Sequence, residues 1–226
     1  ERETSCRSYR GTKLQIIIYV VTSLSLEAKM AGQKQESTEE RPTHVSDPAM
    51  EFLLTEVLRW VEKSCQKQAK ESDEESNIFA AEMAASKLER MGYSVGYRLC
   101  ERLAQNKTFG AAAAGKDPAQ AVAASQLEAV KFLCKEFWME VFRKQIDKLQ
   151  TNHRGVFVLK DMDLRWLTRL PPNQESARVA AIQMLAFPCG LVRGALANLG
   201  IPAVVSCDFL ADGTNMSACS FNIKIK

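Results

Sequence analysis

Apolar residues recur at helical spacing over the first two thirds of the chain. After Asp47-Pro48, Leu54, Leu58 and Val61 recur at i, i+4 and i+7, which predicts a helix from about residue 47 to residue 68. Similar spacing predicts helices over 77–91, 93–104 and 126–150. The last of these is apolar on more than half of its circumference, so we expect a central helix that is buried on two sides.

The period of the pattern changes after residue 154. The runs 155–160 and 164–169 predict one hairpin, and 203–209 and 218–225 predict a second. Between them, a helix is predicted over 173–198, kinked at Pro188 and closed by Gly200. Strands joined by tight turns pair antiparallel, so the sequence predicts an α+β fold, with helices packed on a small antiparallel sheet of two hairpins.

Two regions lack this pattern. Residues 1–48 are expected to be a disordered tail, because 30–48 are polar and charged. Within it, 1–29 hold a short apolar run behind basic residues; we interpret them as a non-native upstream extension, with a signal peptide as the alternative. Residues 106–125 are rich in Ala and Gly and predict a flexible insertion in a single domain over 49–226.

Composition and charge argue against several classes of function. With 30 basic and 27 acidic residues, the chain lacks the strong basic excess of a nucleic-acid-binding protein. Its seven cysteines are odd in number and have no C-x-x-C spacing, which favours free thiols over disulfides or zinc. The two histidines, His44 and His153, have no flanking pattern that suggests a catalytic dyad or a metal site. We therefore expect no catalytic residue, no metal and no cofactor, and the chain is predicted not to be an enzyme.

Residues 110–117 resemble a phosphate-binding loop in part. They match G-x-x-x-x-G-K, but Asp117 stands where a Ser or Thr hydroxyl would hold Mg²⁺. The loop also follows a predicted helix instead of a strand, and Pro118 comes next. We therefore predict a low-complexity loop that binds no nucleotide.

Gly190 and Gly194 are four residues apart on the last predicted helix, on either side of Arg193. Glycines at this spacing allow another backbone to approach closely. We interpret them as tight packing against the central helix; a small apolar slot for an acyl chain or a carboxylate is the alternative.

Three segments resemble a known family. Residues 132–159, which include the Phe137-Trp138 and Thr151–Gly155 motifs, are similar to the subunit 6 family of the transport protein particle (TRAPP), as are 88–96 and 189–200. The resemblance implies a non-catalytic scaffold that forms a heterodimer with another TRAPP small subunit. The complex would tether vesicles in endoplasmic reticulum-to-Golgi transport, act as exchange factor for a Rab-type GTPase, and bind peripherally at the cis-Golgi and endoplasmic reticulum from the cytoplasm.

The alternative function is a fatty-acyl or small-molecule binding module of the same fold. The related partner subunit carries an acylated cysteine, and Cys65 lies near the end of the first predicted helix. An apolar tunnel that ends at Cys65 would favour this alternative, and a filled core would favour the scaffold.

The first two predicted helices carry more apolar surface than one contact would bury. We expect them to form a partner interface, because a soluble monomer rarely exposes so large an apolar patch. The expected interface residues are Leu54, Val57, Leu58, Val61, Phe79 and Met83. The alternative is that the two helices cover each other. Predicted core residues are Leu133, Phe137, Val141, Leu185, Val192 and Phe221.

Overall fold

The computed structural model describes residues 47–66, 74–109, 117–152, 155–168, 174–210 and 215–226. Residues 1–55 and 56–226 form separate units, so the first turns of helix α2 are described by themselves. The disordered tail was expected over 1–48; its residues 1–46 fall outside the described residues, and residues 47 and 48 begin helix α2. Both histidines and most of the 110–117 loop also fall outside the described residues.

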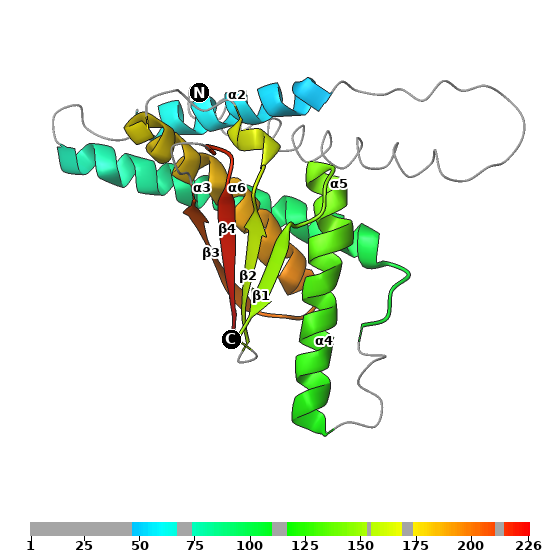
Figure 1. Cartoon of the computed structure of the whole chain (residues 1–226). Coiled ribbons are helices and arrows are strands. Elements are labelled where there is room, and N and C mark those ends of the chain that lie inside the picture. The colour runs from blue at the N-terminus through cyan, green and yellow to red at the C-terminus, as the bar shows by residue number, and fades with distance from the viewer. Residues whose placement is uncertain (1–46, 67–73, 110–116, 153–154, 169–173, 211–214) are drawn as a thin grey trace, which may run out of the picture. The chain divides into compact units, whose positions relative to one another are not determined.

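The helical part contains α2 (Asp47–Gln66), α3 (Glu74–Ala104), α4 (Pro118–Phe132), a π-turn (Leu133–Phe137), α5 (Trp138–Phe142), a 3₁₀ turn (Arg165–Leu167) and α6 (Gln174–Asn198). The strands are β1 (Lys148–Thr151), β2 (Val156–Asp161), β3 (Ala203–Phe209) and β4 (Cys219–Ile225). All three strand pairs are antiparallel, in the order β1-β2-β4-β3. The expected α+β fold is confirmed, and the two hairpins join into one sheet through β2 and β4 (Figure 1).

Helix α6 lies against both α3 and strand β3, and four glycines set its distance from α3 (Figure 1). Gly92 and Gly96 of α3 meet the backbone of α6 between Phe187 and Leu191. A Cβ atom added to either glycine would lie less than 3.0 Å from an α6 carbonyl oxygen. Residues further along α3 contact residues further along α6, so the two helices run in the same direction.

Gly190 and Gly194 make the reciprocal contact. A Cβ atom added to either one would lie less than 3.0 Å from a carbonyl oxygen of α3, at Glu89 or Tyr93. The prediction that these glycines serve packing is confirmed, but the expected partner was wrong. They contact α3 instead of the central helix. The helices predicted over 77–91 and 93–104 form the single helix α3, and Gly92, which lies between them, packs against α6.

A chain of aromatic rings connects the helices to the sheet. Ring centroids lie 5.2 Å apart between Phe221 and Trp138, 4.5 Å between Trp138 and Phe142, 4.7 Å between Phe142 and Trp166, and 6.1 Å between Trp166 and Phe187. These side chains come from β4, α5, the 3₁₀ turn and α6. All the predicted core residues are buried except Val141, which is half-buried.

The carboxyl end of α6 forms the predicted cap. Gly200 has φ +75°, its N–H donates to the carbonyl of Ala197, and the N–H of Ile201 donates to that of Leu196. This pair of bonds is a Schellman motif, which needs the left-handed backbone that glycine adopts without strain. The helix continues through Pro188 as one element.

Three predicted boundaries were wrong. The central helix was expected to reach residue 150, but α5 ends at Phe142 because Arg143 adopts φ 59° and reverses the chain. Strand β1 then occupies 148–151, so β2 pairs with β1, and the predicted strand over 164–169 is instead the 3₁₀ turn. Residues 118–125 were expected to be flexible and form the first turns of α4.

We predict that Gly96→Ala strongly destabilises the chain. Alanine would gain about 1 kcal/mol of helix propensity. Its methyl group would meet the Leu191 backbone, which cannot move aside like a side chain, so we expect a net loss of about 3 kcal/mol. Chemical denaturation measures the difference. Gly200→Asn is the matched control. A Cβ atom added at Gly200 would meet no other atom within 4 Å, and Asn tolerates φ > 0, so this variant should lose little unfolding free energy. Equal losses in the two variants would contradict the close-packing account.

Candidate functional site

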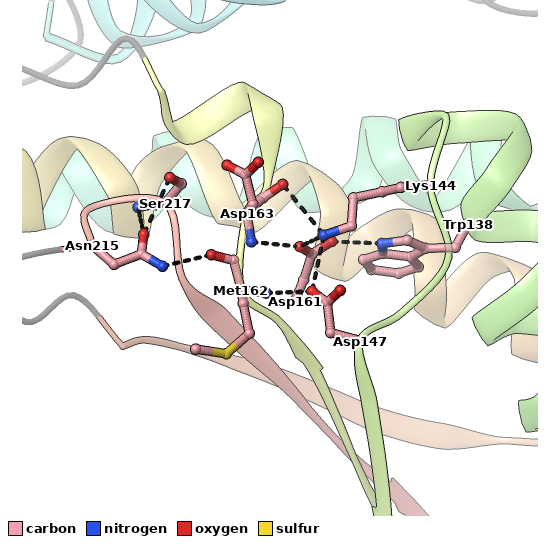
Figure 2. Close-up of polar contacts among 8 residues, drawn as sticks. All are labelled: Trp138, Lys144, Asp147, Asp161, Met162, Asp163, Asn215 and Ser217. Atoms are coloured by element: carbon pink, nitrogen blue, oxygen red, sulfur yellow. Dashed lines mark hydrogen bonds and ion pairs between the residues drawn. The ribbon is translucent and has the colours of Figure 1, made fainter.

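One carboxylate is completely buried where α5, β2 and the following loop meet. Asp161, the last residue of β2, accepts a hydrogen bond from Trp138 Nε1 at 2.8 Å and one from the backbone N–H of Asp163 at 3.0 Å. The ammonium group of Lys144 also donates to this carboxylate, with Nζ 2.6 Å from Asp161 Oδ1 (Figure 2). A buried carboxylate needs this kind of compensation, because desolvation otherwise costs several kcal/mol.

The backbone reversal at Arg143 delivers Lys144 to this carboxylate. Arg143 ends α5 in the left-handed conformation, and its N–H donates to the Met139 carbonyl. The segment that follows is tied back to the π-turn, because the N–H of Ile146 donates to the Cys134 carbonyl at 2.9 Å. Lys144 is thus held between the helix end and β2.

Asp147 extends the network to the loop after β2. Its Oδ2 accepts from Lys144 Nζ at 2.9 Å and from the backbone N–H of Met162 at 2.7 Å. The carbonyl of Met162 accepts from Asn215 Nδ2 at 2.7 Å (Figure 2). Three segments far apart in the sequence are therefore joined by polar contacts.

Two charged groups of the network, Lys144 and Asp147, favour their ionised forms. Desolvation would lower the pKa of Lys144, but hydrogen bonds and attraction from Asp161 and Asp147 outweigh it and raise that pKa. For Asp147, desolvation would raise the pKa, but the Met162 N–H and Lys144 lower it below the ordinary 3.8. Asp147 therefore stabilises the fold above its unfolded pKa, and this contribution is lost as the pH falls through the lower folded value.

The chemistry of this network is that of a structural centre. Asp161 has its oxygens occupied by Trp138, Lys144 and a backbone N–H, so it offers no free base. No group of three or more His, Cys, Asp or Glu side chains among the described residues is arranged to hold a metal ion. The network positions α5, the sheet and the 3₁₀ turn relative to one another.

The structure separates the residues expected at a partner interface into two groups. Leu54, Val57, Leu58 and Val61 of α2 are buried within the chain. On α3, Phe79 is exposed and Met83 is half-buried.

Cys65 lies near the end of α2 and is also buried. Its sulfur accepts a hydrogen bond from Lys87 Nζ of α3 at 3.2 Å. A thiol with a cationic neighbour is a feature that the sequence pattern did not reveal.

One described segment, Arg178–Asn198 of α6, is long and apolar enough to cross a membrane. It packs against α3 and β3, and much of it is buried inside the chain. A core helix of this kind passes the same test of length and composition.

The Asp161 network was not predicted from the sequence. Trp138 lay within the predicted central helix over 126–150, and Asp161 lay between the two predicted strands of a hairpin. Their pairing depends on the helix ending at Phe142, which leaves Lys144 and Asp147 in a loop. The feature of the sequence that could have indicated the network is the acidic segment Asp161-Met162-Asp163, which directly follows an apolar strand.

We predict that Lys144→Met destabilises the chain. The variant keeps the aliphatic bulk but leaves the buried Asp161 carboxylate without its cation. Breaking a buried ion pair costs about 3–5 kcal/mol; because Lys144 is about a quarter exposed, we expect roughly 2–3 kcal/mol after solvent screening. Urea denaturation at neutral pH measures it. Arg59→Met, which breaks the exposed pair with Glu56, should cost less than about 1 kcal/mol. A Lys144→Met loss no larger than this control would contradict the assigned role.

Comparison with known proteins identifies the family. The model of the Transport protein particle (TRAPP) component family matches residues 50–226. Trafficking protein particle complex subunit 6b of Danio rerio is 37% identical over 183 residues, which cover 80% of this chain and 99% of that relative. Subunit 6A of Bos taurus is 33% identical over 186 residues, with 80% and 99% covered. Subunit 6B of Homo sapiens is 41% identical over 141 residues, with 62% and 78% covered.

A solved structure shares the fold. It is trafficking protein particle complex subunit 3 from Naegleria fowleri, with a TM-score of 0.51, 13% sequence identity, and coverage of 80% of this chain and 97% of that one. At this identity the likeness concerns the fold alone. The family match and the subunit 6 relatives, two of which the chain covers almost end to end, show that this chain belongs to the TRAPP component family, as a homologue of subunit 6.

Proposed function

We propose that the chain is a non-catalytic scaffold subunit that forms a heterodimer with another TRAPP small subunit. The assembled complex would tether vesicles in endoplasmic reticulum-to-Golgi transport and act as exchange factor for a Rab-type GTPase. The chain would be cytoplasmic and would reach the cis-Golgi and endoplasmic reticulum membranes only through the complex. Family membership and the names of the relatives support this role.

Exposed apolar side chains near the amino-terminal ends of α3 and α6 support the interface most directly. Ile78 and Phe79 of α3 are 58% and 60% exposed, and Val179 and Ile182 of α6 are 59% and 55% exposed. Because the helices run parallel, these ends lie at the same end of the pair (Figure 1). Large apolar side chains exposed at one end of a helix pair favour contact with another protein.

Five of the six residues predicted from the sequence divide between two roles in this proposal. We assign direct contact with the partner to Phe79 and Met83, which remain accessible on α3. Val57, Leu58 and Val61, which are buried, would support the interface from inside. Leu54 belongs to the separate unit that ends at residue 55, and no role is assigned to it. Leu58→Glu would accordingly unfold the chain instead of acting on the partner alone.

The interface predicts that Phe79→Glu, alone or together with Ile78→Glu, prevents recovery of the partner. Each TRAPP small subunit is co-expressed in turn with the tagged full chain, and recovery is measured by pull-down. The far-ultraviolet circular dichroism of the variants should stay unchanged, because both side chains are exposed. Val122→Glu is the matched control, since Val122 of α4 is 56% exposed and lies outside the proposed surface. Undiminished recovery with the double variant would place the interface elsewhere.

The contact between Cys65 and Lys87 favours a second candidate function, an acyl-binding site. The Naegleria fowleri subunit 3 is described as covalently bound to palmitic acid. In this chain, a cationic amine 3.2 Å from the Cys65 sulfur could stabilise the negative charge that develops as a thiolate leaves an acyl thioester. The Cys65 sulfur would form the new thioester bond, and the donor's thiolate would leave with a proton.

If Cys65 is an acylation site, incubation of the full chain with palmitoyl-coenzyme A should add one palmitoyl mass. Neutral hydroxylamine should remove it, as expected for a thioester. Cys65→Ser should abolish the addition and Lys87→Met should slow it. Cys134→Ser should leave it unchanged, because Cys134 is buried and its burial raises the pKa of the thiol to about 12. Absence of a hydroxylamine-sensitive adduct in the wild type would eliminate this candidate and leave the scaffold proposal intact.

A further inference from the structure

Two cysteines lie on the inner face of the β3–β4 hairpin. In the register of this pair, Cys207 is opposite Phe221 and Phe209 is opposite Cys219. On β3 the residues that flank Cys207, Ser206 and Asp208, are exposed, so Cys207 points to the other face of the sheet. Cys207 and Cys219 are therefore diagonal neighbours on the face that α6 covers.

Helix α6 adds a third thiol to this face. Cys189 is buried on α6, which packs against β3. Its thiol interacts with that of Cys207. A disulfide forms where the two Cα atoms lie within about 7 Å of each other, so the cross-link tests the proximity of these two thiols directly. Both cysteines are free in this structure.

The three thiols differ in their chemistry. The interaction with Cys189 lowers the pKa of Cys207, against the opposing effects of burial and of Asp208. The same interaction, together with burial, raises the pKa of Cys189. Burial also raises the pKa of Cys219. Cys207 is also the one of the three that is partly accessible to solvent. Thiolate character and access together determine which cysteine an oxidant attacks.

We propose that Cys189 and Cys207 are a redox-reactive pair that forms a reversible disulfide on exposure to a hydroperoxide. Cys207 is the thiol that is attacked first, and Cys189 is the resolving thiol. This site is independent of the proposed partner interface and of the candidate acylation site.

The reaction balances in two steps. The Cys207 thiolate attacks the terminal oxygen of hydrogen peroxide, the O–O bond breaks, and hydroxide leaves, which gives a sulfenic acid and water after protonation. The Cys189 sulfur then attacks the Cys207 sulfur. The S–S bond forms, the S–O bond breaks, and the departing hydroxide takes the Cys189 proton and leaves as water. Two thiols are oxidised, and one peroxide is reduced to two waters.

The disulfide would fix the position of α6 on the sheet. Cys189 lies within α6 and Cys207 lies within β3, so the bond would close a loop that includes the Gly200 cap. A cross-link between packed elements stabilises a chain mainly by restricting its unfolded state. Because α3 packs on α6, the link would act on the buried layer and not on a surface loop.

The test uses the full chain, treated with hydrogen peroxide, alkylated to block remaining thiols, and digested. Trypsin alone leaves Cys207 and Cys219 in one peptide, because no Lys or Arg lies between them. A second cleavage before Asp208 separates them, so mass spectrometry can distinguish the possible pairs. We expect a Cys189–Cys207 cross-linked peptide that is two hydrogen masses lighter than its free components, and that disappears after treatment with dithiothreitol.

Two variants make the assignment specific. Cys207→Ser should abolish the cross-link, and Cys189→Ser should instead leave a sulfenic acid at Cys207 that a dimedone reagent captures. Cys100→Ser is the matched control: burial raises the pKa of Cys100 to about 12, and its loss should leave the cross-link unchanged. A Cys207–Cys219 cross-link, or no internal cross-link in the folded wild type, would overturn the proposal. Circular dichroism before digestion establishes that the chain is folded.

Discussion

The contact between α3 and α6 is the constraint on which the rest of the structure depends. Four glycines allow the backbones of the two helices to meet directly, with carbonyl oxygens where Cβ atoms would otherwise stand. Ridges of ordinary side chains keep packed helices 8–10 Å apart. Without these glycines α6 would lie further from α3, and its other face, which carries Leu185, Val192 and Leu196, would lose its fit to the sheet.

The Asp161 network fixes the other end of the core by a different kind of force. Close packing of glycines restricts distance, whereas a buried ion pair with oriented hydrogen bonds restricts direction. Trp138 belongs to this network and to the aromatic chain, because its ring packs against Phe142 and Phe221 while its Nε1–H donates to Asp161. The sheet, the end of α5 and the 3₁₀ turn therefore hold one arrangement.

Local patterns predicted the fold class and failed where tertiary contacts decided the outcome. The strict alternation from Cys219 to Ile225 identified β4, and Gly200 identified the end of α6, because both signals lie within a few residues. Strand β1 was missed, since Leu149 continued a helical spacing and only the reversal at Arg143 ends that helix. Gly92 was interpreted as an interruption because the helix that requires it lies about 100 residues later. The Asp161 network was invisible for the same reason.

The parallel direction of α3 and α6 has an electrostatic consequence. In an antiparallel pair the two helix macrodipoles oppose and largely cancel, but in a parallel pair they add. The amino-terminal end of this pair therefore carries the partial positive charge of two helices, roughly half an elementary charge from each. The first turns of both helices contain acidic residues, Glu74 and Glu75 in α3 and Glu175 in α6, which complement this charge. Salt screens the attraction between these carboxylates and the helix ends, so it acts on the stability of these turns and not on the apolar contacts beside them.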